Sequence, residues 1–411
     1  MRFNPFRPGS PVPPGMFTGR LKEVDTLEKA LFQTKHGNPQ HVLITGERGI
    51  GKSSLLLYLD AVAQGVAAIP SAEEFHFHFV VLRFEPHPNE ELRELLRRLA
   101  LSLTKLDTNI HDIKAKAQKL WAFVQRIEAG GFKLSGGPES APQVELDDFT
   151  DSICEFLQNL GDERDGLLLV VDEADRAEKC DFGSFCKILT ERVQRSSSNR
   201  LGLVLAGLPA LTDLLVSSHE SSLRIFEHIE LTPLKNGDRK EVVLAGLKVA
   251  AEKGDPVTIT DDALESISQM SDGYPQFIQQ FAHSAFEATT DNIIDLEDFR
   301  NGLWDAISQL AAKYFRGPVL QGIFSDDYRT VLAALAKSSD GWVTKAQIRE
   351  RTKLKDSQIT NALTTLKQKQ LIVPKEGVKG VYRLPSKAFA IWIIVALKAP
   401  PAPATLLGAQ T

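Results

Sequence analysis

A run of eight residues in the first part of the chain has the types and spacing of a loop that holds phosphate groups. It fits the pattern G-x-x-x-x-G-K-[ST] at every position. Glycines let the backbone curl so that successive N–H groups face the phosphates, a lysine ammonium reaches the terminal phosphates, and a serine hydroxyl binds magnesium. The predicted contacts come from Gly46, Glu47, Arg48, Gly49, Ile50, Gly51, Lys52, Ser53 and the following Ser54. We therefore predict a nucleotide site in which Lys52 acts on the terminal phosphates and Ser53 holds Mg²⁺.

A second stretch, Leu167–Glu173, is apolar until it ends in an acidic pair. Two carboxylates at the end of a buried strand are unfavourable unless they face a functional crevice. In a phosphate site Asp172 would hold magnesium through water, and Glu173 would be the general base that polarises the attacking water. The alternative is that the pair only caps the next helix.

These two motifs need a framework that brings them together. His41–Thr45 is a short apolar run just before the glycine-rich loop, and helical sequence follows the loop. Four further apolar runs predict strands separated by helices, namely Phe75–Phe84, Leu167–Glu173, Leu201–Leu208 and His228–Thr232. Strands alternating with helices predict an α/β fold, here a P-loop NTPase core with a parallel five-stranded sheet. In such a sheet the carboxyl ends of the strands share one edge, where ligands bind.

The sequence divides into five predicted parts. Residues 1–15 are a proline-rich arm, and residues 16–234 are the nucleotide-binding domain. The strand signal then stops, and residues 235–315 have the pattern of an α-helical lid. Residues 316–398 contain three helices and two short strands around a Lys-Glu-Gly turn, which predicts a winged-helix domain. Residues 399–411, rich in proline and alanine, predict a disordered tail.

Positive charge is concentrated in the predicted winged helix. Twelve Lys and Arg residues between Gly341 and Lys398 outnumber three acidic residues, a net charge of +9 that leaves −14 on the rest of the chain. A basic module with this helix pattern is typical of binding to duplex DNA. Bases would be contacted from the amino end of the third helix by Ser357, Gln358, Thr360 and Asn361. Phosphates would be contacted by Lys375, Lys379, Arg349, Arg351, Lys353 and Lys355. The alternative is a module that docks proteins or neighbouring subunits.

From Met16 to Pro385 the chain resembles the AAA+ ATPases of the origin-recognition and initiator-like type, which grade into the STAND signalling NTPases. Besides the two motifs, Phe17–Glu23 is similar to the family's F-x-G-R-x-x-E box, and Val204–Pro209 to its fourth core strand. Gly273–Pro275 is similar to the STAND-type lid element. The resemblance implies ATP as the nucleotide, and it adds contacts to ATP from Phe17, Gly19, Arg20, Tyr274 and Pro275.

The same resemblance suggests an arginine finger. Arg224–Leu234 is similar to the family's finger region and the strand that follows it. An arginine from a neighbouring subunit would stabilise charge on the transferred phosphoryl group, so the resemblance implies a homo-oligomer in which Arg224 is catalytic. Arg192 and Arg195 are alternatives, and a purely structural role for Arg224 is another.

Two departures from the family imply slow hydrolysis. The fourth strand ends in Leu205-Ala206-Gly207, where the family often has a polar sensor residue, and the nearby Thr212 is a poor match. The lid has Gly273–Pro275 in place of a G-x-R arrangement with an arginine. A slow switch fits these residues better than a strong motor.

The composition is that of an ordinary globular protein, with 43% hydrophobic and 25% charged residues and a net charge of −5 over 411 residues. The amino-terminal residues have no apolar segment typical of a signal peptide. The most apolar run, Ala388–Leu397, is about half as long as a membrane span requires. These observations indicate a cytoplasmic protein that does not associate with membranes.

Together these features predict a switch that binds and hydrolyses ATP, assembles in an ATP-dependent way, and acts on or with DNA through a basic winged helix. The alternative is a STAND-like signalling ATPase that oligomerises with ATP and recruits a separate protein effector, for example in bacterial stress or phage defence. The basic winged helix favours the first function, and the lid element favours the second.

Overall fold

The computed structural model describes residues 2–67, 76–105, 118–130, 142–315, 325–338, 342–369, 371–375 and 377–396. The predicted disordered tail lies outside these ranges. The chain forms two compact units. The first unit is Pro11–Thr232, and the second combines Met1–Ser10 with Pro233–Thr411. The predicted five-part division stays a prediction, and each unit is described by itself below.

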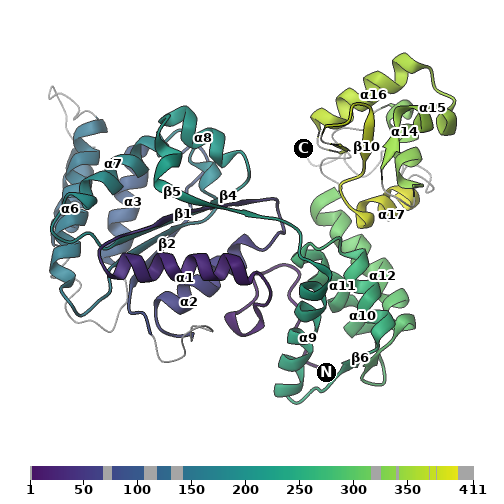
Figure 1. Cartoon of the computed structure of the whole chain (residues 1–411), viewed down its shortest axis with the longest axis horizontal. Coiled ribbons are helices and arrows are strands. Elements are labelled where there is room, and N and C mark those ends of the chain that lie inside the picture. The colour runs from purple at the N-terminus through teal and green to yellow at the C-terminus, as the bar shows by residue number, and fades with distance from the viewer. Residues whose placement is uncertain are drawn as a thin grey trace, which may run out of the picture. The chain divides into compact units, whose positions relative to one another are not determined.

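The first unit is built on the predicted five-stranded parallel sheet (Figure 1). Its strands are β1 (His41–Gly46), β2 (Val80–Phe84), β3 (Leu167–Val171), β4 (Leu201–Gly207) and β5 (Phe226–Leu231). Their order in the sheet is β2-β3-β4-β1-β5, and every neighbouring pair is parallel. All residues of β3 and β4 are buried, as expected for strands covered on both faces.

Helices cover both faces of this sheet. They are α1 (Leu21–Lys35), α2 (Lys52–Ala63), α3 (Leu92–Thr104), α5 (Gln118–Gly130), α6 (Pro142–Leu160), α7 (Phe182–Gln194) and α8 (Leu211–Ser218). Short turns of 3₁₀ helix are η1 (Pro14–Met16), η2 (Ala174–Arg176) and η3 (Ser222–Ile225). Because successive strand residues point to opposite faces, Leu43 joins one hydrophobic cluster with residues of α3, α5, α6 and α7. Helices α1 and α2 contact the sheet separately from that cluster.

The second unit begins with four helices of the predicted lid region. These are α9 (Asn236–Glu252), α10 (Asp261–Met270), α11 (Pro275–Ala288) and α12 (Leu296–Leu310). Strands β6 (Thr258–Ile259) and β7 (Ile293–Ile294) form a short parallel ladder beside them, and a π-helical turn, η4 (Ala311–Phe315), follows α12.

The basic C-terminal segment has the layout expected of a winged helix. Its elements are α14 (Asp326–Ala336), β8 (Val343–Thr344), α15 (Lys345–Thr352), α16 (Asp356–Gln368), β9 (Val373–Pro374), β10 (Val381–Arg383) and α17 (Lys387–Ala396). The three strands form one antiparallel sheet in the order β8-β10-β9. Three helices and the β9–β10 hairpin were expected, whereas the third strand, β8, was not.

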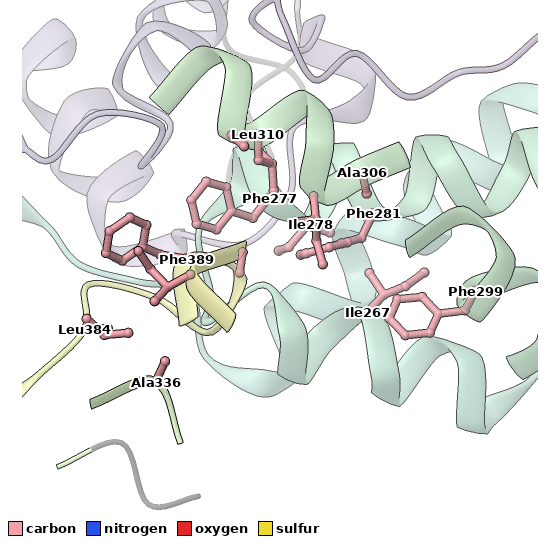
Figure 2. Packing of buried hydrophobic residues seen from close by; sticks show 14 of the residues in the cluster. Ile267, Phe277, Ile278, Phe281, Phe299, Ala306, Leu310, Ala336, Leu384 and Phe389 are labelled. Carbon is pink, nitrogen blue, oxygen red and sulfur yellow. The ribbon is translucent and has the colours of Figure 1, made fainter. Parts of the chain in front are cut away.

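The helices of the predicted lid and the C-terminal segment predicted as a winged helix share one hydrophobic core (Figure 2). Phe277 and Leu310 from the lid belong to the same buried cluster as Leu384 and Phe389 near the end of the chain. Helix α17 carries most of the apolar run that is too short to span a membrane, and it packs against α12 and α14. Within the described residues, no helix is both long enough and apolar enough to cross a membrane.

The first residues of the chain belong to this second core. Phe6 is only 3% exposed, and its ring lies edge-on to Phe286 at 6.2 Å. A Cβ added to Gly246 would come within 2.4 Å of the Phe6 ring, so glycine makes room for it. Asn4 Nδ2 donates hydrogen bonds to the His283 carbonyl oxygen and to Glu287. Residues 2–13 of the arm contain no helix or strand, η1 follows at Pro14–Met16, and Phe6 is part of the core of the second unit.

Candidate nucleotide-binding site

The glycine-rich loop joins β1 to α2 and has the shape that phosphate binding requires. Gly49 and Gly51 have φ values of 76° and 103°, in a region that glycine adopts without steric cost. Lys52 Nζ donates hydrogen bonds to the carbonyl oxygens of Gly46 at 2.7 Å and Glu47 at 3.0 Å. The loop leads directly into the amino end of α2, whose N–H groups and dipole favour an anion.

The electrostatic surroundings of Lys52 combine opposing effects. Burial lowers the pKa of its ammonium group, while the carboxylates of Asp172 and Asp175 raise it. Glu47 and Arg48 are exposed, so they border the loop from the solvent side.

Gly46 is sterically required at the start of the loop. A Cβ there would lie 2.9 Å from Ile50 Cγ2 and 3.0 Å from the Leu231 carbonyl oxygen. Ser53 and Ser54 follow in the first turn of α2, and Ser54 Oγ accepts a hydrogen bond from the Val12 backbone N–H at 3.2 Å. The Ser54 hydroxyl thus binds the segment that leads into the F-x-G-R box.

The predicted F-x-G-R box packs directly against this loop. Arg20 is 8% exposed, and its Nη2 donates to the carbonyl oxygens of Ile50 at 2.8 Å and Thr232 at 2.9 Å. The Phe17 ring stacks on Tyr58 of α2 with centroids 5.2 Å apart. Gly19 has a φ of 74°, which allows the sharp turn before Arg20. Arg20 therefore supports the phosphate loop from behind, and direct contact of the box with ATP stays a prediction.

The acidic pair lies at the carboxyl end of β3, two strands away from β1. Asp172 is buried, and its Oδ1 accepts a hydrogen bond from the Glu173 N–H at 3.0 Å. Its Oδ2 accepts one from Arg83 Nη2 at 2.9 Å. Glu173 has a left-handed backbone with φ of 50°, and its carboxylate forms an ion pair with Arg176.

Three charged residues of this site were missed from the sequence. Asp175 Oδ1 accepts a hydrogen bond from the Leu208 N–H at 2.8 Å, just beyond β4, the strand whose end lacks the polar sensor residue that the family often has. A Cβ on Gly207 would come within 2.6 Å of the same oxygen. Arg83 of β2 contacts Asp172 and Asp60, and burial raises the pKa of Asp60. Thr212, the weak sensor candidate, instead donates its hydroxyl proton to the Pro209 carbonyl oxygen at 2.8 Å.

The three arginine-finger candidates differ in their surroundings. Arg224 is exposed in η3, just before β5. Arg192 pairs with Asp147 at 3.1 Å and with Asp151 at 2.8 Å, which ties α7 to α6. Arg195, at the end of α7, is exposed. Arg192 is thus committed to contacts within its own unit, which leaves Arg224 and Arg195 as better candidates for a contact in trans.

The residues present fit a bound Mg²⁺. The two predicted ligands, the Ser53 hydroxyl and the Asp172 carboxylate, offer hard oxygen atoms, which Mg²⁺ prefers. Lys52 is the first residue of α2 after the phosphate loop, and Ser53 directly follows it in the first turn of the helix. When bound, Mg²⁺ would neutralise charge on the phosphates, while Ser53 and Asp172 would fix its position.

The predicted lid element lies in the second unit. The Leu234 N–H donates to the Gly273 carbonyl oxygen at 2.8 Å, and Gly273 has a φ of 83°. A Cβ on Gly273 would come within 2.6 Å of the Leu234 carbonyl oxygen, so only glycine fits this turn. Tyr274 caps α11, and Pro275 is its first residue. Contact of Tyr274 and Pro275 with ATP stays a prediction.

Residues 16–216 match the family model of the AAA ATPase domain. An uncharacterised HTH-type transcriptional regulator of Methanocaldococcus jannaschii is 24% identical over 272 residues, which are 64% of this chain. The chain spans only 61% of that relative's length.

Two solved structures share the fold over nearly the whole chain. The Walker-type ATPase of Pyrococcus abyssi aligns with a TM-score of 0.54 and 17% identity, covering 92% of this chain and 96% of that one. The ORC2 protein of Aeropyrum pernix, in its ADPNP and ADP complexes, aligns with a TM-score of 0.54 and 16% identity, covering 97% and 99%. At these identities the likeness concerns the fold. The glycine-rich loop and the acidic pair both lie within residues 16–216, so this segment is similar to the AAA ATPase domain, and the chain as a whole is similar in fold to these two solved structures.

Proposed function

We propose that this protein is a slow Mg²⁺-dependent ATPase that assembles with copies of itself when ATP is bound and acts on duplex DNA through its winged helix. One arrangement carries the proposal. A phosphate-binding loop with a buried acidic partner belongs to the same chain as a basic winged helix, and that winged helix shares its core with the lid. ATP binding can then control DNA binding within one polypeptide.

Each step of hydrolysis has a candidate residue in the first unit. Lys52 exchanges the carbonyl oxygens of Gly46 and Glu47 for the more strongly negative terminal phosphates. Ser53 and Asp172 hold the Mg²⁺ that accompanies the nucleotide. Glu173 takes the proton of the attacking water as general base, after its carboxylate separates from Arg176.

The residue beyond β4 supports slow turnover. Asp175 of η2 accepts a hydrogen bond from the Leu208 N–H, so its carboxylate lies beside the end of β4, where the family often has a polar sensor. A carboxylate oxygen that accepts a hydrogen bond does not stabilise the negative charge that develops on the phosphates. Hydrolysis therefore depends on Lys52, Glu173 and a finger supplied by another subunit.

The second unit offers a way to pass the nucleotide state to the winged helix. Asp272 precedes the Gly273–Pro275 element, and its Oδ2 accepts a hydrogen bond from the Lys387 N–H of α17 at 2.6 Å. The shared core around Phe277 and Phe389 joins the same elements (Figure 2). Because packed cores move as rigid pieces, a displacement of the lid would carry the winged helix with it.

The exposed basic residues of the winged helix support binding to DNA phosphates. Lys353 and Lys355 are exposed between α15 and α16, and Lys375 and Lys379 are exposed on the hairpin. Arg351 acts differently, because its Nη1 donates to the Ala334 carbonyl oxygen at the end of α14 at 2.9 Å.

Gln358, one of the predicted base contacts, also has a role within the domain. Its Nε2 donates to Asp327 at 3.0 Å, and its Oε1 accepts from the Lys355 N–H at 3.0 Å. Ser357, Thr360 and Asn361 are exposed on α16 and remain the better candidates for contacts with bases.

DNA binding should be ATP-dependent and salt-sensitive. Fluorescence anisotropy of labelled duplex DNA, with and without ATP at two or more salt concentrations, should give tighter binding with ATP. Lys52→Ala should abolish that tightening. The double variant Lys353→Ala with Lys355→Ala should weaken binding and reduce the slope of log affinity against log salt by roughly 1 for each lost phosphate contact. Lys29→Ala, which removes an exposed lysine of the first unit, is the matched control and should leave the slope unchanged.

The same experiment tests the alternative function. If wild-type protein ignores DNA at low salt but forms larger assemblies with ATP, the winged helix is a docking module. The search should then turn to a protein effector of a STAND-like signalling ATPase.

Arg224→Ala should lower hydrolysis while leaving ATP affinity nearly intact. A finger acting in trans contributes only in the assembled protein, so the rate per subunit of the variant should fall to that of dilute, unassembled wild type and stop rising with protein concentration. Steady-state phosphate release over a concentration series measures this, and equilibrium ATP binding is the control. Arg192→Ala should lose stability instead, because Arg192 pairs with Asp147 and Asp151. Unchanged turnover in Arg224→Ala would leave Arg195 as the next candidate.

A further inference from the structure

Three charged side chains meet where the magnesium carboxylate is held. Arg83 Nη2 lies 2.9 Å from Asp172 Oδ2, and Arg83 Nη1 lies 3.4 Å from Asp60 Oδ2 of α2. The side chains of Asp172, Asp60 and Arg83 are 4%, 13% and 29% exposed. A guanidinium group thus bridges two largely buried carboxylates, one of which is the predicted magnesium ligand.

The position of Arg83 follows from the strand that carries it. In β2 the side chains of Val80, Leu82 and Phe84 are buried on one face of the sheet, so Arg83 points to the opposite face, toward Asp60 of α2. Arg83 pairs in register with Val170 of β3, two residues before Asp172. The backbone therefore fixes Arg83 beside the acidic pair.

The carboxylates of Asp172 and Asp60 differ in the hydrogen bonds that they accept. Both oxygens of Asp172 accept hydrogen bonds, one from Arg83 and one from the Glu173 N–H. At Asp60, Oδ1 is buried and accepts no hydrogen bond from the described residues, and the contact of Oδ2 with Arg83 is the longer one. Asp60 therefore has unused capacity to accept hydrogen bonds from a guanidinium group, which presents five donors in a fixed fork.

We propose that Arg83 is a positioning residue that pairs with Asp172 and transfers to Asp60 when Mg²⁺ binds together with ATP. A divalent cation near Asp172 and the guanidinium group repel each other, so binding of one at this carboxylate weakens binding of the other. Mg²⁺ alone displaces Arg83 poorly, because proteins usually bind Mg²⁺ through one or two carboxylates together with substrate phosphates. Asp172 is then available to Mg²⁺ only when nucleotide binds as well. The inference rests on the proposed binding of Mg²⁺ and ATP.

The first test is metal binding without nucleotide. Mn²⁺, as a paramagnetic substitute for Mg²⁺, is titrated into nucleotide-free protein, and free Mn²⁺ is followed by electron paramagnetic resonance. Arg83→Gln should bind one Mn²⁺ per chain at least about tenfold more tightly than wild type, a difference of about 1.4 kcal/mol. Mg²⁺ alone should also raise the Tm of this variant but not that of wild type. A purely structural ion pair would lower the Tm of the variant without creating any response to metal.

A matched control separates metal binding from general loss of a buried ion pair. Arg98 Nη1 pairs with Glu90 at 2.6 Å, and the Glu90 side chain is 1% exposed. Arg98→Gln also removes the arginine from a buried carboxylate of the first unit, so its Tm should fall without recovery in Mg²⁺. Recovery of Arg98→Gln equal to that of Arg83→Gln would overturn the proposal.

A second variant, Asp60→Asn, should weaken metal binding where Arg83→Gln strengthens it. This test does not require that Arg83→Gln folds. Asp60→Asn removes the charge of the receiving carboxylate, so Arg83 should stay on Asp172. The measured quantity is the ratio of the ATP affinity in Mg²⁺ to the ATP affinity in EDTA. In Asp60→Asn this ratio should be at least about fivefold smaller than in wild type. An unchanged ratio would overturn the transfer to Asp60.

The outcomes also separate this inference from the proposed function. If wild type binds ATP more tightly with Mg²⁺ but Arg83→Gln gains no affinity for Mn²⁺, the ATPase proposal stands and the role of Arg83 is refuted. If wild type binds no ATP under either condition, the nucleotide function itself fails. If nucleotide-free wild type already binds Mn²⁺ as tightly as Arg83→Gln does, Arg83 does not occupy the site.

Discussion

Replacing Glu173 by glutamine should lower the rate of ATP hydrolysis by roughly 10²–10⁴-fold while ATP remains bound, because a general base contributes about that much. The amide of glutamine has nearly the same shape as the carboxylate but does not take a proton from water. Glu173 is the last residue of the acidic pair and is partly exposed, and its carboxylate pairs only with Arg176 among the ion pairs of the described residues. Phosphate release gives the rate, and retention of labelled ATP on the purified variant gives the binding.

Arg176→Gln is the matched control for this prediction. It breaks the same ion pair but leaves the carboxylate of Glu173 in place, so hydrolysis should change by no more than a few-fold. Equal losses in Arg176→Gln and Glu173→Gln would mean that the ion pair matters, and not the base. Full activity in Glu173→Gln would support the alternative that the acidic pair serves only to cap the turn that follows.

The second large effect concerns stability. Phe6→Ala should destabilise the second unit by about 3–5 kcal/mol, the usual cost of removing a buried phenylalanine ring and leaving a cavity. Phe6 is 3% exposed and packs against Phe286 and the backbone at Gly246. Chemical denaturation followed by circular dichroism measures the free energy of unfolding.

The same arm supplies a control for Phe6→Ala. Phe3 is 38% exposed, so Phe3→Ala should cost well under 1 kcal/mol. If both variants lose equally little, the arm contributes no more than a loosely attached segment. If ATP hydrolysis at a temperature where the variants remain folded is unchanged by Phe6→Ala, the arm acts on stability alone.

The parts of the fold that depend on neighbouring residues could be predicted from the sequence. The glycine-rich loop and the acidic pair carry their chemistry within eight and seven consecutive residues, and both lie where expected. The apolar run Leu201–Leu208 became β4 with an end that differs by one residue. Strands buried on both faces leave a continuous apolar signal, which makes them easy to recognise.

The start of β2 was predicted less well, for a local reason. Phe77 and Phe79 are buried and alternate with the exposed His76 and His78, as in a strand. Their backbone bonds instead to a helix end and a loop, because the Phe79 N–H donates to the Ala63 carbonyl oxygen and the His78 carbonyl accepts from Asp165. The side chains alternate between buried and exposed as in a strand, but strand β2, which pairs with β3, begins only at Val80.

Contacts between distant residues left almost no signal. Arg83 and Asp172 are 89 positions apart, and Asp175 lies 33 positions before Leu208. A charged residue in the middle of an apolar strand was the only sign of Arg83, and nothing in the arm indicated that Phe6 would complete the core of the lid. Such pairs are set by tertiary packing, which periodicity along one element does not contain.

The attachment of the arm has a consequence for how the chain matures. Asn4 bonds to a carbonyl oxygen 279 positions further on, so the arm, which is synthesised before those residues, reaches its final neighbours only after they have been made as well. The first unit, Pro11–Thr232, has its own core and can fold during synthesis, before the arm has its partners in the second unit. Closing such a long loop slows the final step. We therefore expect the second unit to complete its fold late, once its two distant segments have come into contact.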